Sequence, residues 1–493
     1  MDQILILLSF SLYLAIVFII GWRAYRRTSD LGDFILGGRR LGSWVAALSA
    51  GASDMSGWLL LGLPGYAYLS GIESIWLAGG LLVGTWLNWK IVAARLRVYS
   101  SISGDSITLP AFFSNRFKDD SGLLQLVSAI FILLFFLFYT SSGLVAGGKL
   151  FESVFGLDYI WAVTVGSLAI ILYTSIGGFL AVSWTDLLQA LLMAVALLIV
   201  PVMAMYDAGG VANAVSAVEA RSVYLLNPFV STDGTALTAV AIISLLGWGL
   251  GYFGQPHILA RFKGIESVEA VPKARRIAIS WTFLTLTGAS MSGLLGIGLF
   301  EPALTDADSE KVFIQMIEAM FHPLIAGLLL AAILAAIMST ADSQLLVSSS
   351  AFTEDIYKRL FNSTASGTSL VLIGRMTVIV IAAIAFILAM NPESKVLDLV
   401  SYAWAGFGAA FGPTLILALY WKRMTRNGAL AGILCGGITV VVWKQLQGGL
   451  FDLYEIVPGC VISILAILIF SMADTKPGSE IQLEFEQMER SVG

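Results

Sequence analysis

The sequence predicts an all-α integral membrane protein in which ten central helices form two groups of five with opposite orientations. Three observations lead to this fold class: the composition, the recurrence of long apolar runs, and two runs that glycine and proline interrupt. Of the 493 residues, 58% are hydrophobic and 12% are charged, about half the charged share of a soluble domain. A soluble globule is therefore excluded, and the lipid bilayer is the expected surrounding.

Apolar runs long enough to cross a membrane as helices recur along the whole chain. The first run follows Met1, Asp2 and Gln3, which carry no basic segment, so we expect a retained helix and not a cleaved signal peptide. An odd number of crossings places the two termini on opposite sides of the membrane. The thirteen runs lie near residues 4–21, 43–65, 73–92, 124–147, 159–178, 187–205, 236–256, 277–300, 323–347, 369–390, 399–420, 428–443 and 456–472.

The basic residues indicate the orientation, because Lys and Arg concentrate in cytoplasmic loops. With the N-terminus outside, most of the 28 basic residues fall in inner loops or in the tail, among them Arg26, Arg27 and Arg261. We therefore predict a multi-pass protein of the plasma (inner) membrane with its C-terminus in the cytoplasm. The exceptions on the outer side are Lys149, Arg221, Lys311, Lys395 and Lys444.

The second run contains residues that a membrane helix normally avoids. Residues 51–58 read GASDMSGW, with two glycines, two serines and Asp54. An ionisable group at bilayer depth costs about 2.5–3.5 kcal/mol on insertion scales, so it is rarely retained without a partner or a transport pathway.

The seventh run is also interrupted. Residues 247–256 read GWGLGYFGQP, in which glycine and proline make a continuous helix improbable. With the first run set aside, the two interrupted runs begin two successive groups of five helices. This is the pattern of an inverted-repeat transporter, whose site lies where two broken helices face each other at the midplane. Close helix packing through small residues is the alternative explanation for the glycines.

The ninth run places hydroxyl groups on one helix face. Ala336, Ser339, Thr340 and Ser343 are spaced as i, i+3, i+4 and i+7. Hydroxyl and carbonyl oxygens suit a hard monovalent cation, and an unwound second run would supply free carbonyls. Alternatively, the hydroxyls bond back to carbonyls of their own helix.

A fourth polar position, Asp186, stands just before the sixth run in the sequence SWTD. Two interpretations remain open: the polar end of a loop, or a relay on the inner part of an ion path.

These segments resemble the sodium/solute symporter family, in particular its sodium/proline symporters. The similarity rests on GASDMSGW in the second run, GWGLGYFGQPHILARF in the seventh and AAIMST in the ninth, with supporting matches at residues 35–39, 175–186, 401–413 and 426–432. The resemblance implies a leucine-transporter-like fold with broken first and sixth core helices. It divides the chain into an extra helix with a basic inner loop (1–40), the ten-helix core (41–420), two further helices (421–473) and a cytoplasmic tail (474–493). The tail shows no clear apolar periodicity and is expected to be disordered or loosely surface-bound.

For the ion, the resemblance implies one set of ligands and two residues along the pathway. Asp54 corresponds to an aspartate required for sodium-dependent transport, and Asp186 to a residue associated with ion release; we expect Asp54 to act as a nearby charge and not as a ligand. The implied sodium ligands are the carbonyls of Ala52, Met55 and Ala336 and the hydroxyls of Ser339 and Thr340.

For the substrate, the resemblance implies an L-proline site with aromatic walls. A proline ring fits aromatic side chains, and its charged groups fit free N–H and carbonyl groups of broken helices. Taken alone, the aromatic residues would be ordinary core or interface residues. The implied substrate residues are Tyr139, Trp248, Tyr252 and Pro256, with Ser56, Gly57 and Trp58 beside them.

The expected function is therefore sodium-driven symport of proline by alternating access, with sodium co-transported and with no organic cofactor and no nucleic acid partner. An enzyme is not expected, because the two histidines, His257 and His322, stand in no hydrolase or metalloprotease motif. Proton coupling, another small amino-acid or organic solute, and a membrane solute sensor are the alternatives. The oligomeric state is left open.

Overall fold

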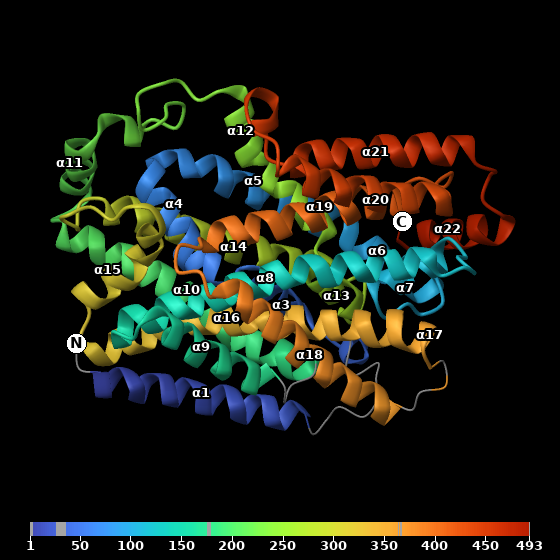
Figure 1. Cartoon of the computed structure of the whole chain (residues 1–493), viewed down its shortest axis with the longest axis horizontal. Helices are drawn as coiled ribbons and strands as arrows, with labels where there is room; N and C mark the ends of the chain where they lie inside the picture. The colour runs from blue at the N-terminus through green and yellow to red at the C-terminus, as the bar shows by residue number, and fades with distance from the viewer. Residues whose placement is uncertain (1–2, 26–35, 175–178, 363, 365–366, 493) are drawn as a thin grey trace.

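The computed structural model describes residues 3–25, 36–174, 179–362, 364 and 367–492. In these residues the chain is helical, with two isolated β-bridges and no strand. Many of the long helices lie side by side along the long axis (Figure 1). They are α1 (Gln3–Tyr25), α5 (Ser74–Leu87) continued by η4 (Asn88–Val92) and α6 (Ala93–Ile102), α8 (Leu123–Phe155), α9 (Tyr159–Thr174), α10 (Phe179–Asp207), α14 (Val271–Gly296), α16 (Pro323–Ser350), α18 (Gly367–Ala389), α19 (Val396–Tyr420), α20 (Arg426–Trp443) and α21 (Ile456–Ala473). Arg26, Arg27 and the start of the 175–186 motif lie outside the described residues.

All thirteen predicted runs fall mainly on helical residues. Ten helices in the described part of the chain are long and apolar enough to cross a membrane, and two further apolar helices, Tyr159–Ile171 and Ala239–Gly254, are shorter. The second and third runs are separated at Gly71, whose φ of 65° and ψ of −142° are not helical, although helical residues lie on both sides of it from Trp58 to Ile102. The multi-pass membrane architecture is confirmed, whereas the count of thirteen crossings stays a prediction.

The second run is interrupted, as predicted. Helix α3 (Ser43–Asp54) ends at the carboxylate, and Met55 leaves helical geometry with φ −84° and ψ 78°. The chain continues as a π-helical segment, η2 (Trp58–Gly62), and then as α4 (Leu63–Ser70). The last carbonyls of α3 therefore lack the helical partners that a continuous helix would provide.

The seventh run is interrupted in a different way. Helix α12 (Ala239–Gly247) tightens into a 3-10 segment, η6 (Trp248–Gly254), which ends at the extended residue Gln255. Pro256 then begins α13 (Pro256–Gly264), where its missing N–H costs nothing. The packing explanation for the glycines also holds, because a Cβ on Gly249 would lie 2.2 Å from the carbonyl oxygen of Gly80.

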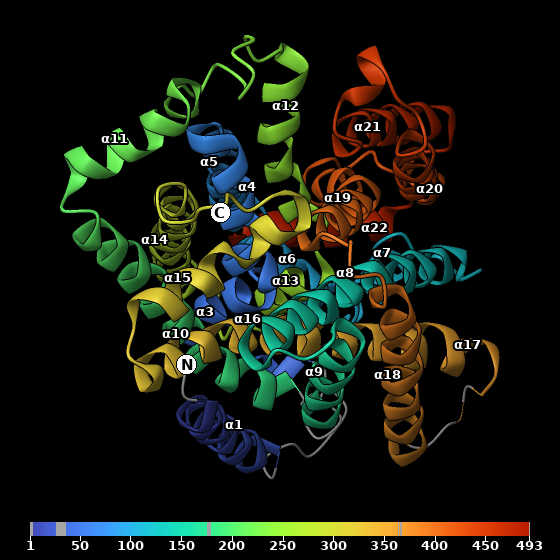
Figure 2. The same cartoon turned by 60° about the vertical axis from the view of Figure 1, so that its left-hand side comes forward.

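Two helices lie at the centre of the bundle. In α16 and α19, 83% of the residues in the most apolar window are buried, compared with 28% in α1. Figure 2 shows α16 and α3 surrounded by other helices, with α1 on one side and the α20–α21 pair on another. The hydroxyl-bearing face of α16 is therefore shielded from lipid.

The acidic segment 301–311 is only partly solvated. Within it, η7 (Asp306–Lys311) carries Glu310, which is 3% exposed. Its carboxylate pairs with Lys149 of α8 at 2.5 Å and accepts hydrogen bonds from the amides of Val396 and Leu397. Lys149, assigned to an outer loop, is thus a buried residue of α8.

Of the two expectations for the tail, disorder was wrong, and loose surface binding understates its packing. Residues of the tail form α22 (Ser479–Val492), whose Phe485 and Met488 are buried. The ring of Phe485 contacts Tyr99 of α6, with 6.2 Å between the centroids. Acidic residues of α22 pair with Lys118 and Lys422, basic residues of two predicted inner loops. Helices α1 and α22 lie toward opposite ends of the molecule (Figure 1), and which end faces the cytoplasm stays a prediction.

Candidate functional site

The broken end of α3 meets the hydroxyl face of α16. The carbonyl oxygen of Ala52 accepts hydrogen bonds from Ser339 Oγ at 2.8 Å and from Thr340 Oγ1 at 3.2 Å. Ser339 Oγ also lies 3.0 Å from the carbonyl oxygen of Ala336. Two carbonyl and two hydroxyl oxygens therefore converge across 287 residues of sequence, in the chemistry that a small hard cation prefers. We call Ala52, Ala336, Ser339 and Thr340 the oxygen cluster.

Met55, the fifth predicted ligand, is not joined to the oxygen cluster by a direct hydrogen bond. Its amide closes the last turn of α3 by donating to the carbonyl oxygen of Gly51 at 2.8 Å. Its sulfur accepts a hydrogen bond from Thr285 at 3.7 Å. Met55 therefore lies at the end of the same helix, and its side chain anchors that end to α14.

Asp54 connects the two broken segments. It is 1% exposed, and its Oδ2 accepts a hydrogen bond of 2.7 Å from the hydroxyl of Tyr252 in η6. Its carbonyl oxygen accepts hydrogen bonds from Tyr139 Oη at 2.8 Å and from Trp58 Nε1 at 3.1 Å. One residue at the broken end of α3 thus holds three aromatic side chains that were predicted to bind substrate.

Aromatic rings from separate segments pack around this junction. The rings of Trp58 and Trp248 lie 6.4 Å apart, and Trp248 stacks on Tyr454 at 5.4 Å. Trp404 of α19 meets Tyr252 edge-on at 4.9 Å and donates a hydrogen bond of 2.7 Å to the carbonyl oxygen of Trp248. The predicted aromatic residues therefore share one region of the core.

The remaining predicted substrate residues shape the backbone. Ser56 donates its amide to the carbonyl oxygen of Asp54, and its hydroxyl accepts from the amide of Trp58. Gly57 allows close approach to α8, because a Cβ there would lie 2.5 Å from Cβ of Ala146. Pro256 begins α13, whose first amides donate no hydrogen bond to a capping side chain.

Sequence reasoning missed three residues of this region. Trp404 lies within the matched segment 401–413, but it was not singled out as a site residue. Gln255 holds the second break by donating to the carbonyl oxygens of Gly251 at 3.0 Å and Trp404 at 3.3 Å. His257, considered above only for enzyme motifs, is buried 5.9 Å from the ring of Tyr139. Its ring nitrogens have no hydrogen-bond partner among the described residues.

Asp186 lies inside α10, so the loop-end interpretation is wrong. It is fully buried, and its Oδ2 pairs with Arg261 Nη2 at 3.0 Å and accepts from Ser49 at 2.6 Å. Arg261 also donates to Ser343 at 2.6 Å. Arg261 was assigned to a basic inner loop, whereas it is a fully buried residue of α13. The network joins α3, α10, α13 and α16, and the ion-relay interpretation of Asp186 stays a prediction.

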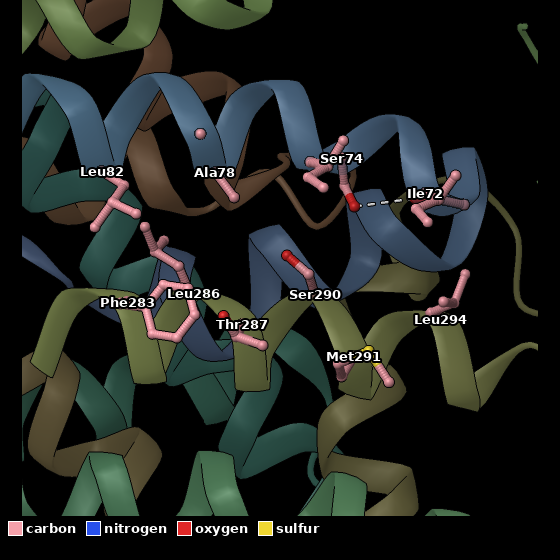
Figure 3. Close-up of a pocket in the computed structure, with 13 residues that line it drawn as sticks. Ile72, Ser74, Ala78, Leu82, Phe283, Leu286, Thr287, Ser290, Met291 and Leu294 are labelled. Atoms are coloured by element: carbon pink, nitrogen blue, oxygen red, sulfur yellow. Dashed lines mark hydrogen bonds between the residues drawn. The ribbon is translucent and has the colours of Figure 1, made fainter. Parts of the chain in front are cut away.

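The cavities show how tightly the candidate site is packed. A cavity of about 10 Å³ is bordered by Asp54 and Tyr252, which is room for about one water molecule. A larger cavity of about 270 Å³ lies between α5 and α14 (Figure 3). It is lined mainly by apolar side chains such as Leu286 and Met291 and includes none of the predicted site residues. A solute of proline size therefore requires the two broken segments to move apart.

Comparison with known proteins covers nearly the whole chain. The chain is 52% identical to the sodium/proline symporter of Salmonella typhimurium, over 97% of this chain and 95% of that protein. It is 51% identical to the sodium/proline symporter of Escherichia coli, over 98% and 95% of the two chains. The osmoregulated proline transporter OpuE of Bacillus subtilis is 47% identical, over 98% of both chains.

Solved structures support the fold. A Na⁺-coupled sialic acid symporter in a substrate-bound, outward-open state matches with a TM-score of 0.79 at 20% identity, over 96% of this chain and 99% of that chain. The nucleobase-cation symporter Mhp1 matches with a TM-score of 0.55 at 14% identity, over 92% and 98%. The predicted leucine-transporter-like fold is therefore confirmed.

The family assignment does not depend on the three matched runs alone. The sodium:solute symporter family matches residues 34–436, which include both broken segments, the oxygen cluster and the buried Asp186 network. With this match and relatives near 50% identity over almost the full length, the chain belongs to the sodium:solute symporter family, a family of solute transporters.

Proposed function

We propose that this protein is a secondary active transporter that couples inward sodium movement to the uptake of L-proline. The observation that carries the proposal is the position of Asp54. It lies two residues after Ala52 of the oxygen cluster, and it accepts the hydroxyl of Tyr252 at 2.7 Å. The similarity to three proline transporters supports the choice of proline.

In this proposal sodium is bound by the oxygen cluster together with the carbonyl of Met55. The Ser339 and Thr340 hydroxyls already lie against the carbonyl of Ala52, so binding requires rotation of hydroxyl groups and little backbone movement. The cation would hold the end of α3 against α16. This contact would fix the position of Asp54, whose carbonyl and carboxylate accept the hydrogen bonds of Tyr139, Trp58 and Tyr252.

Proline would bind where the two broken segments face each other. Trp58, Trp248 and Tyr139 offer surfaces for the ring, with Ser56 and Gly57 beside them. The uncapped amides at the start of α13, next to Pro256, suit the carboxylate of proline. Because sodium and proline stabilise the same arrangement of Asp54, each should increase the binding of the other by the same factor.

The driving force is sufficient for one sodium ion per proline. A membrane potential near 100 mV contributes about 2.3 kcal/mol per charge, and a roughly tenfold sodium gradient adds about 1.4 kcal/mol. Together they support roughly 500-fold accumulation. We further propose a plasma-membrane location with the N-terminus outside and the C-terminus, including α22, in the cytoplasm. Asp186 and Arg261 would then lie on the inner part of the ion path.

Uptake by the purified protein in proteoliposomes tests this function. Labelled proline should accumulate when an inward sodium gradient is imposed and should not accumulate when only a proton gradient is imposed. Accumulation driven by protons alone would contradict sodium coupling. Equal uptake of unrelated amino acids would contradict the choice of proline.

A further inference from the structure

A strip of residues leads from the candidate proline site toward one end of the bundle. Pro256, Ala260 and Lys263 line a third cavity, of about 20 Å³. Their spacing of four and three residues places them on one face of α13. The opposite wall is formed by residues of α16, including Ser350, and by residues 107–110 at the start of α7 (Leu109–Arg116). Since Pro256 is a predicted substrate residue, the cavity adjoins the proposed proline site along α13.

The far end of this cavity carries a buried cation. Lys263 is 2% exposed, and its ammonium group makes one hydrogen bond, to the carbonyl oxygen of Ile107. An ammonium group has three N–H donors. Lys263 therefore retains donors that no described residue uses.

A buried carboxylate lies near the same end. Asp355 is fully buried, and its Oδ1 accepts hydrogen bonds from Thr108 at 2.9 Å and from Gln125 at 2.6 Å. Its Oδ2 has no hydrogen-bond partner in the part of the chain that the structure describes. Lys263 donates to the carbonyl of Ile107 and Asp355 accepts from the next residue, Thr108, so the two charged groups lie near each other, but no ion pair within 4.0 Å joins them in that same part of the chain.

Two buried charges that do not pair directly are costly, because each loses hydration without full compensation. The cost is reduced when a ligand with both charges lies between them. Asp355 is also held in a π-helical segment, η8 (Ala351–Tyr357), a backbone form that is frequent at functional sites. The position, the opposite signs and the unused hydrogen-bonding groups together suit a small zwitterion.

We propose that Lys263 and Asp355 form a second, transient site for a zwitterionic amino acid on the release path. The carboxylate of the amino acid binds the Lys263 ammonium, and its ammonium group binds Asp355, with the Thr108 hydroxyl alongside. The inference rests on the proposed function, because it needs proline to leave along α13. Its consequence is that proline is held after it leaves the aromatic site, which increases affinity on the release side and slows transport from that side.

Sided kinetics with Lys263→Met and Asp355→Asn test this site. The half-saturating proline concentration on the α22 side should rise about tenfold, the factor expected when a hydrogen bond between charged groups is lost. Because kcat/KM compares the transition state with free protein and free proline, a site that stabilises only bound proline leaves it nearly constant, so kcat from that side should rise by a similar factor. The KM on the opposite side should change by less than about twofold, because proline there meets the aromatic site first.

Two variants serve as controls. Lys263→Arg keeps the charge and should retain most of the affinity on the α22 side. Lys358→Met removes a lysine that is 39% exposed and paired with Glu354, also in the helical segment that follows α16, and should leave both KM values unchanged.

The outcome separates the second site from the proposed function. If the unmodified protein shows no sodium-driven proline transport, the proposed function fails. If it transports proline but Lys263→Met lowers kcat equally in both directions without changing KM on the α22 side, Lys263 is only structural and the second site is refuted. An unchanged KM in Asp355→Asn also refutes it.

Discussion

The two broken segments are both marked by glycines in the sequence, but they present different chemical groups to the rest of the bundle. The first break ends a regular α-helix at Asp54 and leaves backbone oxygens that meet the hydroxyls of α16. The second break narrows to a 3-10 segment and presents Tyr252 and Trp248, held by Gln255 and Trp404. Small residues therefore allow an interruption, whereas the neighbouring helix decides its chemistry. In the proposed function, the first break binds the cation and the second lines the solute site with aromatic rings.

The largest expected effect comes from removing the hydroxyls opposite the first break. In Ser339→Ala/Thr340→Ala, the half-saturating sodium concentration for proline uptake should rise by more than about 100-fold, beyond the 10–100-fold typical of residues that only support ligands. Proline uptake measured over a range of sodium concentrations gives this half-saturating concentration. Ser292→Ala removes a buried hydroxyl of α14 that bonds back to the carbonyl of Gly288 and serves as a stability control. An unchanged sodium dependence would show that sodium does not bind at this break.

A larger residue at Gly251 should disturb the second break selectively. Its added Cβ would lie 1.9 Å from Trp404 Nε1, so the indole must shift and its hydrogen bond to Trp248 is weakened. Overpacking of this kind costs about 1–3 kcal/mol. We expect Gly251→Ala to raise the KM for proline more than the half-saturating sodium concentration. Gly79→Ala is the matched control, because a Cβ there meets nothing within 4 Å.

The hydrogen bond between the breaks can be removed without loss of the ring. Tyr252→Phe deletes the hydroxyl that donates to Asp54 Oδ2 and should raise the KM for proline about tenfold, the cost of an unsatisfied buried carboxylate. Isothermal titration of proline at high and low sodium would also show weaker coupling between the two ligands. Tyr159→Phe, which loses a 2.9 Å bond to the carbonyl of Ala389, is the control. Equal coupling in Tyr252→Phe and the unmodified protein would show that the breaks act independently.

The smallest expected effect is that of Asp54→Asn. If Asp54 is a nearby charge and not a ligand, apparent sodium affinity should fall by roughly three- to tenfold, as for one lost electrostatic contact. The carbonyl that binds Tyr139 is retained in this variant. Complete loss of sodium coupling at saturating sodium would make Asp54 a direct ligand. Unchanged affinity would leave its burial unexplained.

The sequence predicts the candidate site best where a feature depends only on residues close together in the chain. The hydroxyl face of α16 follows from helical spacing, and the interruptions follow from glycine and proline. The positions of Asp186 and Arg261 were predicted less accurately, because the sequence near the end of an apolar run does not show whether a charged residue is solvated or buried in an ion pair. The two residues pair with each other although they stand 75 positions apart in the sequence. The tail was misjudged because Phe485 and Met488 form a short apolar face that is visible only against α6.

The membrane class, the helical architecture, the two interruptions and the family follow from the sequence, because composition and periodicity act locally and matched segments are long. The bond of Asp54 to Tyr252, the pairing of Arg261 with Asp186 and the burial of Lys263 near Asp355 are known only from the packed structure. The reason is physical: burying a polar group requires a partner, and in a bundle that partner comes from whichever distant helix packs alongside.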